Sequence, residues 1–134
     1  MRPVQIAALV GSLAVLAWSV GGLIVNPDFA SGDSATAKTV LGSDMNGWHA
    51  LSGFLVAVPA LLLLRRNPRT LALFLLVAAG SLTATAMWAL AETHPVGGLF
   101  YFPNNEVDAL LHITVSAIFV AGAVSELRRE RQFA

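Results

Sequence analysis

The chain has 134 residues, of which 56% are hydrophobic and 12% are charged, and its formal net charge is zero. A soluble domain of this length exposes too much surface to hide so large an apolar fraction, so we expect the lipid bilayer to be its solvent. The absence of cysteine excludes disulfides, thiolate nucleophiles and thiolate metal sites. The basic residues are split over short, separate segments, so we expect no nucleic-acid partner.

Apolar runs predict, in chain order, helices at about residues 4–25, 47–64, 70–91 and 107–125. A helix of roughly 20 apolar residues crosses the hydrocarbon core of a bilayer. The first run is too long for a cleaved signal peptide, so we expect a retained helix. No run alternates with a period of two, so strands are not expected. The sequence therefore predicts an all-α fold: one four-span transmembrane domain over residues 1–134, a four-helix bundle.

The basic residues predict the orientation of this bundle. Seven of the eight are Arg2, Arg65, Arg66, Arg69, Arg128, Arg129 and Arg131, which flank the apolar runs on alternate sides. Six of the eight acids lie in or directly after the intervening segments, 26–45 and 92–104, together with one base, Lys38. The positive-inside rule then places both termini in the cytoplasm. We expect a multi-pass protein of a bacterial plasma membrane.

Small residues recur in two of the predicted helices. The first contains Gly11 and Gly22, and the third contains Gly80, Thr83 and several alanines. In lipid, such residues let helices approach closely, and hydroxyl groups form hydrogen bonds between helices. We therefore expect these residues to pack inside the bundle.

Two similar segments begin the second and fourth apolar runs: Asn46-Gly47-Trp48-His49-Ala50-Leu51 and Asn105-Glu106-Val107-Asp108-Ala109-Leu110. Asparagine is a preferred helix N-cap, so we expect Asn46 and Asn105 to cap helices that enter from the outer face. Asp108 is then placed to accept hydrogen bonds from first-turn amides. The repeated pattern predicts two helical hairpins of like orientation.

Three features of the sequence are shared with a known family: the doubled helix starts, the four-span layout and the Asp108-x-x-x-His112 spacing. In them the chain resembles a largely actinobacterial family of small four-helix membrane proteins catalogued only as a domain of unknown function. The resemblance covers most of the chain and implies the architecture but no activity. The family's pattern also has a histidine at the position where this chain has Gly53. A site built from equivalent histidines of both repeats is therefore not implied.

A cluster of ionisable residues is predicted near the outer membrane boundary. Asp108 and His112 share one face of the fourth helix, because they are four residues apart. His49 opens the second helix on the same side, and Glu92 and His94 close the third. The simplest interpretation is structural: Asp108 caps its helix, and Asp108 or a carbonyl group of a neighbouring helix holds His112 by a hydrogen bond of about 0.6–2 kcal/mol.

Three ligand interpretations use the same residues. Haem b would take His49 and His112 as axial ligands, but His112 lies about 6 Å deeper in its helix, and quinone binding is the related redox alternative. A divalent metal would take Asp108, His112 and His49, with His94 or Glu92 as fourth ligand. A proton site is the last alternative, because an imidazole beside a carboxylate titrates near neutrality.

From these features we predict a non-enzymatic protein without a bound cofactor, serving as an accessory or scaffold subunit of a membrane assembly. The outward segments are too short for a separate domain, and four helices leave little room for a transport path. The expected partners are the lipid bilayer and either other membrane protein subunits or further copies of this chain.

Overall fold

The computed structural model describes residues 1–30, 36–91 and 103–132, which form four helices and one short β-hairpin. The helices are α1 (Pro3–Val25), α2 (Gly47–Leu63), α3 (Pro68–Ala91) and α4 (Glu106–Gln132), and the strands are β1 (Lys38–Val40) and β2 (Ser43–Met45). The prediction of an all-α bundle of four helices is confirmed, with the strands as an addition. Helices α1, α3 and α4 are long and apolar enough to cross a membrane, and α2 is shorter, with 17 residues.

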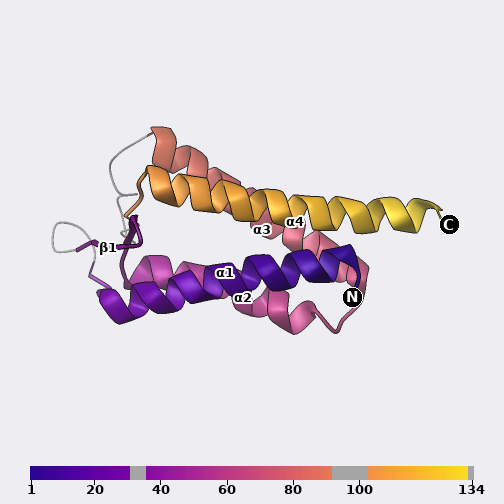
Figure 1. The fold of residues 1–134 in the computed structure, drawn as a ribbon, viewed down its shortest axis with the longest axis horizontal. Helices are drawn as coiled ribbons and strands as arrows, with labels where there is room; N and C mark the ends of the chain where they lie inside the picture. Colours follow the sequence, from indigo (N-terminus) through magenta and orange to yellow (C-terminus); the bar gives the residue numbers. More distant parts are fainter. Residues whose placement is uncertain (31–35, 92–102, 133–134) are drawn as a thin grey trace.

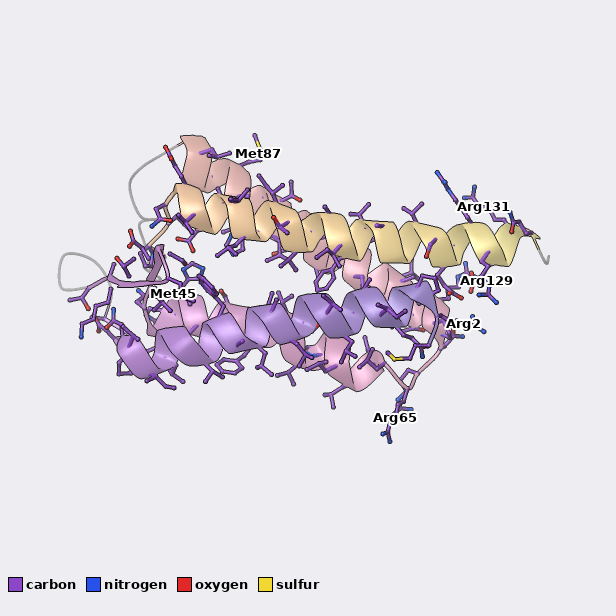
Figure 2. All side chains as sticks on the ribbon, in the orientation of Figure 1. Arg2, Met45, Arg65, Met87, Arg129 and Arg131 are labelled. Atoms are coloured by element: carbon purple, nitrogen blue, oxygen red, sulfur yellow. The ribbon has the colours of Figure 1, made fainter. Side chains whose placement is uncertain are left out.

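The helices are arranged as two antiparallel pairs. The most extensive contacts join α1 to α2 and α3 to α4, and α1 also packs against α4. Figure 1 shows that α1 begins and α4 ends at one end of the bundle, while the β-hairpin lies at the opposite end. Four labelled arginines, Arg2, Arg65, Arg129 and Arg131, lie at the first end, and Met45 lies at the second (Figure 2). We call these the basic end and the hairpin end.

Close packing between α1 and α4 depends on glycine. A Cβ atom at Gly11 of α1 would collide with the ring of Phe119, and one at Gly122 of α4 would collide with Ala7. Phe119 is fully buried in the main hydrophobic core. The expected packing role is thus confirmed for Gly11. It is wrong for Gly80, which is exposed, with no atom within 4 Å of where its Cβ would be.

Helix α4 continues past the predicted end at residue 125, to Gln132. The prediction ended the helix where the apolar run ends, but Glu126 points into the bundle and is 1% exposed. The Nη1 atom of Arg2 donates a hydrogen bond to Oε1 of Glu126 at 2.5 Å. The Nε2 atom of Gln5 also donates to the carbonyl of Leu64, at 2.9 Å. These contacts connect the start of α1 to α4 and to the end of α2.

The β-hairpin contradicts the expectation that strands are absent. Val40 pairs with Ser43, so Leu41 and Gly42 form a two-residue turn, and their φ angles of 50° and 93° suit a type I′ turn. Each strand has three residues, too few to produce a visible alternation. Hydrogen bonds to the start of α4 hold the hairpin in place.

The segment after α1 is held by Asp28. Its carboxylate accepts hydrogen bonds from the hydroxyl and amide groups of Thr36 and from the amide of Ala30. The hydrogen bond from the Thr36 side chain, with those two amides, lowers the pKa of Asp28 below its usual value. The amide of Gly47 donates to the Asp28 carbonyl at 2.7 Å, which ties this segment to the start of α2.

Candidate functional site

Three of the predicted site residues converge at the hairpin end of the bundle. Nε2 of His49 lies 4.0 Å from Oδ1 of Asp108. The ring centroids of His49 and His112 are 5.7 Å apart, with the planes tilted by 42°. His49 is 6% exposed and Asp108 is 1% exposed. The other two, Glu92 and His94, lie outside the described residues.

Helix capping positions two of these side chains. Oδ1 of Asn46 accepts from the amide of His49 at 2.9 Å, and Oδ1 of Asn105 accepts from the amide of Asp108 at 3.1 Å. Oδ2 of Asp108 accepts in return from the amide of Asn105, also at 3.1 Å. This reciprocal pair is a capping box, with aspartate in place of the usual glutamate. The predicted N-cap roles of both asparagines are confirmed.

Asp108 also joins α4 to the β-hairpin. The Ser43 hydroxyl donates to Oδ1 of Asp108, and the amide of Asp44 donates to Oδ2 at 3.2 Å. Nδ2 of Asn105 donates to the carbonyl of Gly42 at 2.9 Å. Ser43 is fully buried and was not among the predicted site residues. A single serine in a polar segment carries no pattern that would distinguish it from a surface residue.

A backbone carbonyl determines which nitrogen of His49 carries a proton. Nδ1 of His49 lies 3.0 Å from the carbonyl oxygen of Asp44. A carbonyl only accepts, so Nδ1 is the protonated nitrogen, and in the neutral ring Nε2 carries a lone pair. The nitrogen available for chemistry is therefore the one beside Asp108.

His112 differs from the structural interpretation, in which a hydrogen bond holds it. Its Nδ1 atom is buried and has no hydrogen-bond partner among the residues that the structure describes. The carboxylate expected to hold it is engaged by Ser43, Asp44 and Asn105 instead. A buried polar atom without a partner costs free energy, so His112 calls for an explanation other than packing.

A cavity of about 840 Å³ lies between the two helical pairs and includes this cluster. Its lining includes Trp18 of α1, Gly53 of α2, Trp88 of α3 and both imidazoles, and most of the remainder is apolar or small. Nε1 of Trp18 is also buried, without a hydrogen-bond partner in the described part of the chain. Trp88 is 44% exposed, so the cavity is not sealed.

The positions of the histidines and of Asp108 can be compared with what a metal ion or a haem group requires. Within residues 1–30, 36–91 and 103–132, no three His, Cys, Asp or Glu side chains are placed to hold a metal ion. The offset of about one helical turn does not keep the imidazoles of His49 and His112 apart, since their ring centroids are 5.7 Å from each other. However, Asp108 lies beside the His49 nitrogen that would bind iron, where a macrocycle needs space.

The site thus combines a cavity, two adjacent imidazoles and a buried carboxylate bound by three donors. Such an arrangement suits the binding of a small molecule. A fold by itself does not imply a function, so the function has to be inferred from the site. Comparisons of the chain with family models, with curated proteins and with solved structures find no match.

Proposed function

We propose that this chain is a non-enzymatic, four-span protein of a bacterial plasma membrane that binds a small, mainly apolar molecule between its two helical pairs. The observation that carries the proposal is the cavity of about 840 Å³. Protein interiors are close-packed, with few voids larger than a water molecule, and ligand sites typically measure about 300–1,000 Å³. The buried nitrogens of His112 and Trp18, which belong to lining side chains, support the same conclusion.

The surface supports placement in a membrane. Large apolar side chains on three helices are exposed, including Ile24 at 77%, Leu62 at 72% and Val77 at 73%. Water would make such exposure costly, whereas lipid does not. The arginines gather at the basic end (Figure 2), and the positive-inside rule makes that end cytoplasmic. The cavity and its imidazoles then lie toward the outer face.

We further propose that the two helical pairs arose as a repeat. Asn46 and Asn105 cap their helices through the same hydrogen bond, and His49 and Asp108 occupy equivalent positions. The equivalent of His112 is Gly53, where a Cβ atom would collide with the hydroxyl of Ser19. Close packing of α1 on α2 accounts for a glycine at this position.

The proposed topology predicts opposite labelling of two single cysteines. The chain has no cysteine of its own, so each label reports one position. Ala37→Cys, on an exposed residue before β1, should react with a membrane-impermeant thiol reagent in intact cells. Gln132→Cys, at the exposed end of α4, should react only after permeabilisation. Labelling of both positions in intact cells would contradict the arrangement.

Ligand binding is tested by filling the cavity. Ala84 of α3 lines the cavity, and Gly80, one turn away, does not. Extraction of purified wild type and Gly80→Phe with organic solvent should release one small molecule in near-stoichiometric amount, as detected by mass spectrometry. Ala84→Phe should release several-fold less, because the added ring occupies the cavity. Equal amounts from all three proteins would refute the proposal.

A second function, as an accessory or scaffold subunit, is favoured by the outward position of Gly80. A small residue on an exposed helix face lets another helix approach closely in lipid, whether from a different subunit or a second copy. Mass determination of the particle purified in mild detergent tests this function. A monomer without any co-eluting protein would refute it and would leave the ligand proposal unaffected.

A further inference from the structure

Two hydrogen-bond acceptors face each other in the cavity lining. In the neutral His49 ring, Nε2 carries a lone pair, because Nδ1 donates to the Asp44 carbonyl. Oδ1 of Asp108, 4.0 Å away, belongs to a carboxylate that accepts from three donors, as an ionised group does. Two acceptors at this separation do not bond to each other, but both are within reach of one donor group. A molecule bound here is therefore expected to present a donor.

The site disfavours charged molecules of either sign. The Asp108 carboxylate repels anions, and among the described residues no lysine or arginine lines the cavity to attract them. The N-termini of α2 and α4 meet at this cluster, where His49 and Asp108 lie in the first turns. A helix N-terminus carries a partial positive charge, which opposes a cation. An uncharged donor, such as a hydroxyl group, fits best.

The lining favours an aromatic ring with an apolar tail. Trp18 and Trp88 lie on α1 and α3, and the imidazoles of His49 and His112 lie on α2 and α4. Flat side chains pack well against a flat ring, in stacked or edge-on arrangements. Away from these rings most of the lining is aliphatic, including Val15, Val56 and Leu82, so it suits a hydrocarbon chain.

We propose that the cavity binds a phenol-type molecule, an aromatic ring with a hydroxyl group and an apolar tail, a class that includes membrane-soluble hydroquinones. The hydroxyl group donates to the acceptor pair formed by Nε2 of His49 and Oδ1 of Asp108, and the ring lies beside His112. The inference rests on the proposed ligand-binding function and names the class of ligand.

A matched pair of probes tests the hydroxyl group. para-Decylphenol and para-decylanisole share the ring and tail, but only the phenol donates a hydrogen bond. In equilibrium dialysis with purified protein in detergent, the phenol should bind about tenfold or more tightly, the usual effect of a hydrogen bond to a charged group. His49→Phe removes one of the two acceptors and should lower the ratio several-fold. Thr85→Val is the control: Thr85 lines the cavity, but its hydroxyl donates to the Ser81 carbonyl, so the ratio should not change.

The ratio of the two affinities distinguishes loss of the hydrogen bond from loss of folded protein, because a partly unfolded variant loses affinity for both probes. If His49→Phe does not fold, the nitrogen NMR shifts of His49 in the wild type provide the second measurement, and only the phenol should move them. A wild-type ratio near one, or one unchanged by His49→Phe, would overturn the proposal. Equal affinity for decyl alcohol would overturn its aromatic part. The two proposals can fail separately. If solvent extraction releases a molecule from the wild type but not from Ala84→Phe, and the ratio of phenol to anisole affinity is one, then ligand binding stands and only the phenol-type ligand is refuted.

Discussion

Replacing Asp108 by alanine is expected to lower the free energy of unfolding by about 3–5 kcal/mol, the usual cost of breaking a buried charged network. The change removes the acceptor of the Ser43 hydroxyl and of the amides of Asp44 and Asn105. Buried donors without an acceptor keep their desolvation cost without compensation. It also removes the two hydrogen bonds from the β-hairpin to Asp108 and leaves the one from Asn105 to the Gly42 carbonyl, so the hairpin should be held less firmly on α4. Reversible unfolding in mixed detergent micelles measures the loss.

Glu106→Ala is the matched control for Asp108→Ala. Glu106 lies in the same first turn of α4, but it is exposed, so its loss should change the free energy of unfolding by no more than about 0.5 kcal/mol. The loss for Asp108→Asn should lie between those for Glu106→Ala and Asp108→Ala, since the amide oxygen of the asparagine side chain still accepts from Ser43. A similar loss for Glu106→Ala and Asp108→Ala would show that any carboxylate in the first turn of α4 has this effect, and that the hydrogen bonds of Asp108 do not account for it.

Replacing Gly11 by leucine is expected to destabilise the bundle by roughly 3 kcal/mol, at the upper end of what overpacking costs. Even a Cβ atom at this position would collide with the ring of Phe119, which is fully buried. The added side chain should push α1 away from α4 where Phe119 packs in the main core. The same unfolding measurement, supported by the thermal midpoint in detergent, reports the effect.

Gly80→Leu is the control for Gly11→Leu, because it introduces the same side chain into a helix at a position where a Cβ meets no atom within 4 Å. We expect a change within about 0.5 kcal/mol for an exposed site of this kind. Glycine is a poor helix former, so its loss does not destabilise a helix. If both leucine variants were equally destabilised, the contact between Gly11 and Phe119 would not be the cause.

Local patterns in the sequence predicted the helices and part of the site. Hydropathy depends on consecutive residues, and the predicted starts of the helices agree with the observed ones to within two residues. Capping depends on one helical turn, which is why the pattern around Asn46 and Asn105 located both helix starts. The predicted end of α4 was wrong because the contact that bears on it comes from far away in the chain: the buried Glu126 pairs with Arg2 of α1.

By itself, then, the sequence determined that this is an apolar four-helix chain, and which residues cap α2 and α4. Only the tertiary structure decided that His49, Asp108 and His112 meet, that Ser43 binds Asp108, and that Nδ1 of His112 has no hydrogen-bond partner among the described residues. The physical reason is the range of the interactions. Helix formation and capping depend on residues within one or two turns of each other. The cavity depends instead on how the two helical pairs pack. The Gly11–Phe119 contact joins α1 to α4 in the main core, and the β-hairpin binds α4 at the hairpin end (Figure 1).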